Sequence, residues 1–460
     1  MIPRIDNLPE VSTLYREYLT ELKNLGFSGD IEEEHSSRLL CATDNSVYQC
    51  MPQAVIFPRS CKDIALAMKL RGHSDYKRVI FTPRGGGTGT NGQSLNRGIT
   101  LDCSRYLKEV RNFNVQKQEI TVQSGVIKDE LNELIKKEGL FFSPELSTSS
   151  RATIGGMISN DAAGQGSLKY GRTSSHIKAV TVVLTDGSVA TFGPVSGSEL
   201  DKKMNLPGLE GDLYRKLVPL LKDNRAKICE IFPKLNRFMT GYDLFHAYDA
   251  DTGTVNLSRL ICGAEGTLGI LYEAVLDLTP LPKYRGLLVV KYDNFFSALK
   301  NAIPLIEAGA LSVETVDSKV LKLAMQDNIW LSVQEYIREV PGKEIAGLNI
   351  VEFAGKDALQ EQEKLDTLYK ELLSCTKLGN AGILGVQKVL NSQGIAAVYG
   401  MRKKAVGLLG NAAGRRKLVA FTEDTVVPPK DLADYIREFR ALLDAKGVPY
   451  GMFGHVDTGL

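Results

Sequence analysis

The sequence predicts an α+β fold with a ligand-binding first part and a second α+β domain after it. Its 460 residues are enough to form two or three domains with hydrophobic cores. Two long glycine-rich segments, 82–94 and 143–172, interrupt the first part of the chain. From residue 283 onward, short apolar runs alternate with amphipathic helical patterns, which is typical of one sheet covered by helices.

The composition is that of an ordinary soluble protein. Hydrophobic residues make up 43% and charged residues 24%, and the net charge of +2 gives no indication of a nucleic-acid partner. No apolar run approaches the roughly 18 residues of a membrane span, and the polar N-terminus does not resemble a signal peptide. The seven cysteines are scattered without a C-x-x-C pair, so no zinc or iron–sulfur site is visible. Their odd number is typical of a reducing compartment, and we expect a cytoplasmic protein.

The first 282 residues are expected to hold an extension and one domain. Residues 1–47 form a helical extension, because STLYREYLTELKNLGF places apolar residues at helical spacing. Residues 48–282 form the domain, which Pro280 and Pro282 end. In chain order we expect the strand AVIF, the helix CKDIALAMKLRGH, the strands RVIFTP, GITLDC and EITVQ, the helix IKDELNELIKKE ended by Gly139, the hairpin HIKAVTVVLTDGSVATFG, and helical, charged material over 200–240.

Residues 283–460 are expected to form the second α+β domain. The expected strands are GLLVVKYDN, LSVETVDS, LNIVEFAG, KLVAFTEDTVVP and the run ending in GMFGHV. The expected helices are FFSALKNAIPLIEAG, which carries Pro304, then DALQEQEKLDTLYKELLSC and PKDLADYIREFRALLDAKG.

The first glycine-rich segment contains a G-x-G-x-x-G pattern, from Gly87 to Gly92, as in nicotinamide-binding Rossmann domains. In those domains the pattern opens a helix, and an acidic residue follows about 20 positions later. Here LNRGITLDC follows, which predicts a strand, and Asp102 comes only ten positions after Gly92. The context therefore argues against a nicotinamide site. Consecutive amides in this loop can instead form a nest for a diphosphate, with Arg84 adding charge; the alternative is a wide glycine turn without a ligand.

The second glycine-rich segment makes the ligand-free alternative less attractive. It carries five glycines among small polar residues, at positions 155, 156, 164, 166 and 171. Two such segments in one domain are costly in chain entropy. A large cofactor that the main chain touches along its length would offset this cost.

Three motifs in order carry a resemblance to a known superfamily. PRGGGTGTNGQS, SPELSTSSRATIGGMISNDAAGQGSLKYG and CGAEGTLGI resemble the FAD-binding domain of the vanillyl-alcohol-oxidase/p-cresol-methylhydroxylase superfamily. The resemblance spans residues 48–460 and is greatest to FAD-linked D-2-hydroxy-acid dehydrogenases, which act on glycolate, D-lactate or D-2-hydroxyglutarate. The N-terminal extension and NRFMTGYDL (236–244) resemble the long members, which are fused to an iron–sulfur domain and act on D-2-hydroxyglutarate. The resemblance implies a two-subdomain FAD-binding domain over 48–282 and a ferredoxin-like α+β substrate domain over 283–460.

The same resemblance implies a set of residues around FAD. They would hold the diphosphate, line the ring and ribityl chain, and close over the cofactor; they are Arg84, Gly85, Gly86, Gly87, Thr88, Gly89, Thr90, Asn91, Gln93, Ser94, Pro144, Ser147, Thr153, Gly155, Gly156, Asn160, Gly164, Tyr170, Glu265, Gly266 and Ile270. No histidine lies in the first loop, and the resemblance implies noncovalent FAD. A covalent link to the remote His176 is the alternative.

Oxidation of a 2-hydroxy acid needs a cation for the carboxylate, a base for the hydroxyl proton and a hydride acceptor at the α-carbon. In the resembling family an arginine at the place of Arg402, in YGMRKKAVGLLG, grips the substrate carboxylate. The alternative is that residues 402–404 form only a solvated helix start.

His455, in GMFGHVDTGL, aligns with the first histidine of a family motif, Gly-His-x-Gly-Asp-Gly-Asn-x-His, that binds a divalent metal, commonly zinc. The second histidine would fall at position 462, beyond residue 460, and Asp457 and Thr458 replace the usual Gly and Asp. We therefore expect a C-terminal domain that is incomplete at its end, with the metal site, base and iron–sulfur cluster only in a longer protein.

We also expect FAD binding with little turnover; the alternatives are a D-lactate or glycolate dehydrogenase and a flavin-binding protein without activity. The sequence does not predict the electron acceptor. It is compatible with a homo-oligomer but does not fix the oligomeric state.

Overall fold

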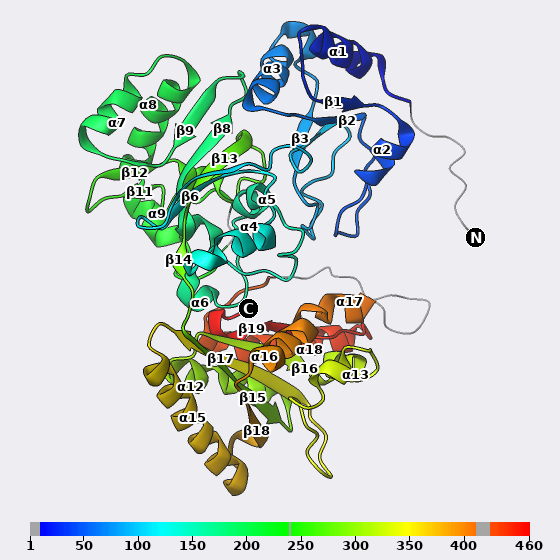
Figure 1. The fold of residues 1–460 in the computed structure, drawn as a ribbon, viewed down its shortest axis with the longest axis vertical. Helices are drawn as coiled ribbons and strands as arrows, with labels where there is room; N and C mark the ends of the chain where they lie inside the picture. Colours follow the sequence, from blue (N-terminus) through cyan, green and yellow to red (C-terminus); the bar gives the residue numbers. More distant parts are fainter. Residues whose placement is uncertain (1–9, 239–240, 411–423) are drawn as a thin grey trace.

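The computed structural model describes residues 10–238, 241–410 and 424–460. Two parts of the chain lie one above the other in Figure 1: an N-terminal part up to residue 282, blue to green, and a C-terminal domain, yellow to red. The N-terminal part contains two main sheets, and the C-terminal domain contains one. This mixture of helices and sheets confirms the predicted α+β class. Within the described ranges, no helix combines the length and apolar character that a membrane crossing needs.

The first subdomain is built on a four-stranded sheet with the order β1-β2-β4-β3. Strands β2, β4 and β3 are parallel, and α3 connects β2 to β3, as parallel pairing requires. Strand β1 pairs antiparallel with β2 at the edge of this sheet. The N-terminal segment, expected to be a helical extension, therefore contains a strand as well as helices. Helix α1 packs on α3, where the buried Tyr18 hydroxyl donates to the Ala67 carbonyl at 2.6 Å. The bounds are α1 Thr13–Asn24, β1 Asp30–Glu32, α2 His35–Leu40, β2 Ala54–Phe57, α3 Cys61–Arg71, β3 Phe81–Arg84 and β4 Ile99–Asp102.

The second subdomain is built on an antiparallel sheet with the order β5-β6-β13-β8-β9. Helices α4 and α5 bury their apolar faces in the same core as β6, β8 and β13. Strands β8 and β9 form the predicted hairpin, and Gly187 has a φ of 83° in its turn. The main bounds are β5 Val110–Asn114, β6 Glu119–Gln123, α4 Lys128–Ile135, α5 Ile154–Asn160, β8 Ile177–Val183, β9 Val189–Phe192 and β13 Ile270–Asp277. The remaining elements are β7 Leu140–Phe141, α6 Ser167–Tyr170, β10 Pro194–Val195, α7 Gly197–Met204, α8 Gly208–Asp223, α9 Arg225–Ile231, β11 Tyr248–Asp249, β12 Thr254–Asn256, α10 Ser258–Ile261 and β14 Thr279–Pro280.

The C-terminal domain is built on one antiparallel sheet with the order β18-β15-β17-β16-β19. Alternate residues of β15 and β17 enter two separate cores, so helices cover both faces of this sheet. Helices α13, α14, α16 and α17 cover one face, and α11, α12, α15 and α18 cover the other. The bounds are β15 Tyr284–Tyr292, α11 Phe295–Lys300, α12 Ala302–Glu307, β16 Ser312–Asp317, α13 Ser318–Met325, α14 Trp330–Val333, β17 Gly347–Gly355, α15 Ala358–Leu378, β18 Ile383–Val389, α16 Ser392–Lys403, α17 Ala405–Gly410, α18 Leu432–Ala445 and β19 Phe453–His455.

Two expected elements of this domain differ in the structure. The single helix expected over FFSALKNAIPLIEAG is divided into α11 and α12 at Asn301, and Pro304 lies in the first turn of α12, where proline is tolerated. The Asn301 side chain accepts a hydrogen bond from the buried Tyr292 hydroxyl at 3.1 Å, which fixes the break. Of the strand expected in KLVAFTEDTVVP, residues 417–423 lie outside the described residues, and 424–428 form no strand.

The first glycine-rich loop leaves β3 after Arg84 and enters the parallel neighbour β4 at Ile99. No helix follows the G-x-G-x-x-G pattern, so the loop does not have the strand–loop–helix geometry of a nicotinamide site. The second glycine-rich segment contains the short helices α5 and α6.

Candidate functional site

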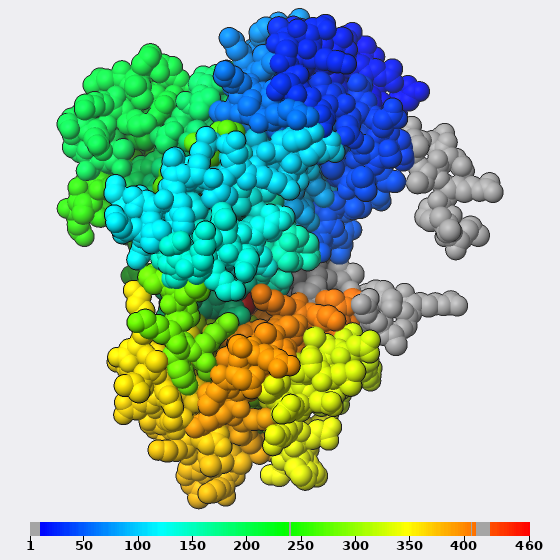
Figure 2. Space-filling view, in the orientation of Figure 1, coloured from blue at the N-terminus to red at the C-terminus, as the bar shows by residue number. Residues whose placement is uncertain are grey.

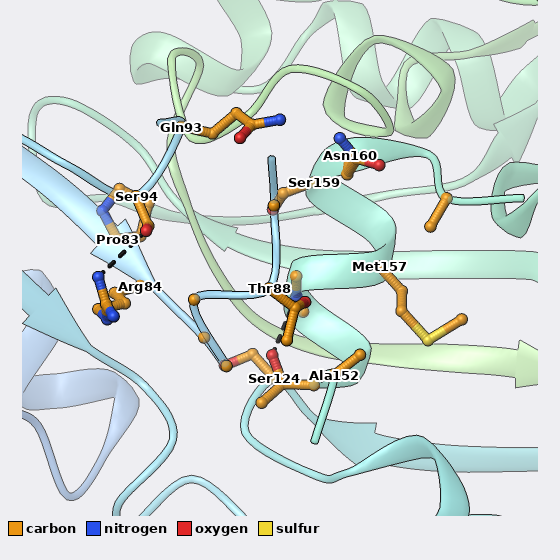
Figure 3. Close-up of a pocket in the computed structure, with 18 of the residues that line it drawn as sticks. Pro83, Arg84, Thr88, Gln93, Ser94, Ser124, Ala152, Met157, Ser159 and Asn160 are labelled. Atoms are coloured by element: carbon orange, nitrogen blue, oxygen red, sulfur yellow. Dashed lines mark hydrogen bonds between the residues drawn. The ribbon is translucent and has the colours of Figure 1, made fainter. Parts of the chain in front are cut away.

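The two glycine-rich segments enclose a cavity of about 220 Å³ between the subdomains. Figure 3 shows side chains from the β3 end, the first loop and α5 around this space. Thirteen residues predicted from the sequence line it: Arg84, Gly85, Gly86, Gly87, Thr88, Gly89, Gln93, Ser94, Thr153, Gly155, Gly156, Asn160 and Glu265.

Glycine is required in the first loop because the loop lies directly on the start of α5. A Cβ on Gly85 would lie 2.1 Å from Thr153 Oγ1, and one on Gly86 would lie 2.2 Å from the Arg151 carbonyl oxygen. A Cβ on Gly155 would lie 2.6 Å from the Ser124 Cβ. These glycines therefore allow the main chain of the first loop to pack against the start of α5 at the cavity wall.

Arg84 braces the first loop. Its Nη1 donates to Ser94 Oγ at 3.1 Å, as the dashed line in Figure 3 shows, and its Nη2 donates to the Thr43 carbonyl at 2.9 Å. Ser94 Oγ in turn donates to Asp44 Oδ2 at 3.0 Å. The guanidinium is thus held beside the glycines, and the otherwise open loop is tied to the N-terminal segment.

Glu265 joins the three motifs. Its Oε1 accepts hydrogen bonds from Gln93 Nε2 at 3.2 Å and from Asn160 Nδ2 at 3.0 Å. Glu265 has a φ of 51°, a left-handed conformation that is uncommon for a residue with a side chain. The next residue, Gly266, has a φ of 80° and lies against Pro83, which a Cβ would approach to 2.5 Å.

A second cavity of about 380 Å³ adjoins the first, and Gln93 and Glu265 line both. Asn91 lines this second cavity, as do the buried charges of Asp161 and Arg172, whose ion pair measures 2.8 Å. The two cavities together fall in the usual size range of sites for large ligands.

The remaining predicted residues line neither cavity: Thr90, Pro144, Ser147, Gly164, Tyr170, Gly266 and Ile270. Gly164 packs on the Glu145 carbonyl, Tyr170 stacks edge-on against Phe141, and Ile270 is 2% exposed in a core. His176 also lies outside the linings; its Nε2 is within 2.7 Å of the Tyr170 carbonyl oxygen.

Sequence reasoning missed several lining residues. They are Pro83, Cys103, Ser124, Leu146, Thr148, Ala152, Met157, Ser159, Ala162, Ala163 and Leu271. Cys103 and Ser124 directly follow β4 and β6, and this position at a strand end was their one available signal. All the others except Leu271 lie inside the two glycine-rich segments, so the unusual composition of those segments was the signal for them.

A buried charged cluster lies on the α16 side of the C-terminal sheet. Glu314 of β16, 1% exposed, pairs with Arg402 Nη2 at 2.9 Å and with His455 Nδ1 at 2.5 Å. His455 is the antiparallel partner of Glu314 in β19, and Arg402 extends from the last turn of α16. The Arg402 guanidinium stacks over Phe453 at 4.5 Å. The structure thus brings the predicted Arg402 and His455 onto one carboxylate that the sequence analysis did not single out.

The electrostatics of this cluster extend to the N-terminal part. Burial alone would raise the pKa of Glu314, but the charges of His455, Arg402 and Arg237 lower it below its usual range. Burial, and then the charge of Glu314, raise the pKa of Asp457 to about 8. Arg237 belongs to NRFMTGYDL, and its Nη2 donates to the carbonyl of Ala163, a lining residue of the first cavity, at 3.1 Å. Arg237 therefore contacts the cavity wall and lies close enough to the charged cluster for its charge to act on Glu314.

Further polar contacts fix the C-terminal domain on the N-terminal part. Gln165 Nε2 donates to Glu352 Oε2 at 2.6 Å, and Lys403 Nζ pairs with Glu145 at 3.1 Å. Figure 2 shows the corresponding surfaces, orange for the C-terminal domain and cyan for the N-terminal part, in direct contact. Lys403 therefore has a partner across the interface and is not a free surface cation.

Comparison with known proteins agrees with this geometry. Residues 52–193 match the FAD binding domain, and residues 281–460 match the C-terminal domain of FAD linked oxidases. The chain belongs to the FAD-linked oxidases. Its full length is 51% identical to D-2-hydroxyglutarate dehydrogenase of Pantoea ananatis and 50% identical to that of Escherichia coli, and covers 45% of each relative. The chain thus spans less than half the length of these two relatives.

More distant similarities show the same fold. The glycolate oxidase subunit GlcD of Bacillus subtilis is 24% identical over 94% of this chain and 76% of its own. A solved structure of alkyldihydroxyacetonephosphate synthase superposes on 89% of this chain and 66% of its own, with a TM-score of 0.62 and 16% identity.

The cavities fit the cofactor of this superfamily. The glycines let the main chain of the first loop pack directly on the start of α5 at the cavity wall, and the buried Ser124 hydroxyl in the lining has no nitrogen or oxygen partner among the described residues. Both features suit a large polar ligand. The metal was expected only in a longer protein, and the described residues contain no group of three histidine, cysteine or acidic side chains placed for a metal ion.

Proposed function

We propose that this FAD-linked oxidase chain forms the site at which a D-2-hydroxy acid, D-2-hydroxyglutarate, is oxidised to 2-oxoglutarate. The observation that carries the proposal is that Arg237 binds the wall of the glycine-lined cavity while its charge acts on Glu314, the partner of Arg402. A redox cofactor site thereby adjoins a cationic site for an organic acid.

FAD would be held without a covalent bond by the lining residues of the first loop and α5, and Glu265 would fix the facing wall. The predicted residues that line neither cavity would support the loops from behind. When bound, FAD would accept the hydride from the α-carbon of the acid.

Arg402 would bind the C1 carboxylate of the acid. Its side chain is only 10% exposed, pairs with Glu314 and stacks on Phe453, so its position is set before the substrate arrives. The Arg402–Glu314 pair also keeps this cation compensated when no acid is bound. The substrate carboxylate would share the guanidinium with Glu314, since an arginine offers five N–H donors.

His455 would be one ligand of a divalent metal. The Glu314 carboxylate holds its Nδ1 and leaves Nε2 available, an arrangement common for metal-binding histidines. Because the described residues do not complete a metal site, we assign no step of the reaction to a metal. An iron–sulfur cluster in a longer protein, self-association and a cytoplasmic location remain predictions, and no electron acceptor is predicted.

Titration of the FAD-loaded protein under anaerobic conditions tests the proposal. We expect D-2-hydroxyglutarate to change the flavin absorption saturably, by perturbation or by bleaching, at lower concentrations than D-lactate or glycolate. The L-enantiomer of 2-hydroxyglutarate serves as the control and should have a smaller effect. A spectrum that none of these acids changes would contradict the proposal.

A further inference from the structure

Arg237 is a buried cation whose contacts in the structure do not use all of its donors. Only 7% of the residue is exposed, although it lies in the polar segment between α9 and β11. Its Nη2 is held by the Ala163 carbonyl at 3.1 Å, and Asp424 Oδ2 lies 3.7 Å away. Its Nη1 is buried and has no hydrogen-bond acceptor among the described residues.

Arg402 has the same property on the other side of the cluster. Its Nη2 pairs with Glu314, while its Nε is buried and has no acceptor among the described residues. Buried N–H groups of charged side chains almost always have an acceptor, because leaving one without a partner costs the whole desolvation penalty. The two guanidinium groups each have an unused buried donor, and both therefore need further acceptor oxygens.

The positions of the two arginines indicate the ligand that supplies these oxygens. Arg402 comes from the C-terminal domain, and Arg237 comes from the N-terminal part beside the wall of the first cavity. A ligand between them meets one guanidinium from each part of the molecule. A monocarboxylate can satisfy one of these cations, whereas a short dicarboxylate can satisfy both.

We infer that Arg237 binds the distal carboxylate of the substrate and thereby selects a dicarboxylic 2-hydroxy acid over a monocarboxylic one. This inference rests on the proposed function and assigns a residue to its substrate class. Arg402 binds the C1 carboxylate beside the reacting carbon, and Arg237 binds the C5 carboxylate. Selection follows from the unused Nη1 donor, because a methyl group in place of the distal carboxylate leaves that donor buried and unpaired.

The test compares two acids that differ only at the distal end. D-2-Hydroxyglutarate and D-2-hydroxyvalerate have the same carbon chain, but the latter ends in a methyl group. Dissociation constants for both are measured by titration calorimetry of the FAD-loaded protein, so that no turnover is needed. The variants are Arg237→Gln, Arg237→Lys and Arg402→Gln, and the matched control is Arg437→Gln, whose side chain is 52% exposed on α18.

We expect Arg237→Gln to weaken D-2-hydroxyglutarate binding roughly 10- to 100-fold and to leave D-2-hydroxyvalerate binding within about 2-fold of the wild type. Arg237→Lys should recover part of the lost affinity. Arg402→Gln should weaken the binding of both acids, and Arg437→Gln should change the dissociation constant of neither. FAD content and unfolding temperature show whether each variant is folded.

Three results would overturn the inference. In the first, Arg237→Gln weakens the binding of both acids equally. In the second, the variant binds D-2-hydroxyglutarate as tightly as the wild type does. In the third, it loses FAD while remaining folded, which would assign Arg237 to the cofactor site. If the wild type binds neither acid, the proposed function itself fails. That outcome is distinct from a wild type that binds D-2-hydroxyglutarate and a variant that binds it equally well.

Discussion

Replacement of Glu314 by glutamine should destabilise the C-terminal domain strongly. Glu314 is 1% exposed and holds two partners, Arg402 at 2.9 Å and His455 at 2.5 Å. Removal of one member of a buried ion pair costs about 3–5 kcal/mol, because the other charge remains buried without compensation. Glutamine keeps the shape and one acceptor oxygen, so we expect about 3 kcal/mol, at the lower end of this range.

Urea unfolding measures this effect in the relevant domain. Trp330, the single tryptophan of the chain, packs against the core that lies under the cluster, so its fluorescence reports the unfolding of the C-terminal domain. The matched control is Glu133→Gln, because Glu133 is 77% exposed and its one ion pair among the described residues is with the surface residue Lys136. We expect the control to change the free energy of unfolding by less than about 0.5 kcal/mol. Equal unfolding midpoints for the two variants would show that the Glu314 cluster does not stabilise the domain.

Two further predictions concern the cofactor loop and a buried lysine. A Cβ at Gly86 would lie 2.2 Å from the Arg151 carbonyl oxygen, whereas ordinary contact begins at 3.4 Å. Gly86→Ala should therefore displace the loop and weaken FAD binding, measured by flavin fluorescence, about 10-fold or more. Gly407→Ala is the control, because no neighbouring atom of the described residues lies within 4 Å of the added Cβ, and it should leave FAD affinity unchanged. Equal FAD affinities of the two variants would contradict the role of the loop. Burial, and then the charge of Arg338, lower the pKa of Lys291 from 10.5 to about 8, so the folded state binds fewer protons between these values and its stability rises with pH there. The unfolding free energy of the wild type should therefore rise relative to that of Lys291→Met between pH 8 and 10.5. A difference between the two proteins that does not change with pH would contradict this assignment.

Local sequence patterns predicted the elements better than they predicted the site. The β8–β9 hairpin and the helix α15 follow from alternation, Asp-Gly chemistry and helical spacing within one segment. The division at Asn301 depends instead on a hydrogen bond from Tyr292 inside the folded domain. No local pattern contains that contact.

The candidate site shows the same division. The glycine loops were predictable because their composition is unusual in any context. Glu314 was not, because LSVETVDS has the pattern of a half-buried strand, and the position of its carboxylate between Arg402 and His455 depends on the pairing of β16 with β19. Arg237 reaches the cluster only because the two parts of the molecule pack together. Contacts between distant segments decide both positions.

The main chain of the two glycine-rich segments is proposed to hold FAD. The most direct measurement is the flavin content of the purified protein after incubation with excess FAD and desalting, with acid precipitation to separate bound from covalently attached flavin. We predict one FAD per chain, all of it released by acid, and no retention of a nicotinamide dinucleotide in a parallel sample. A folded protein that retains no flavin, while Trp330 fluorescence confirms an intact C-terminal domain, would contradict the account.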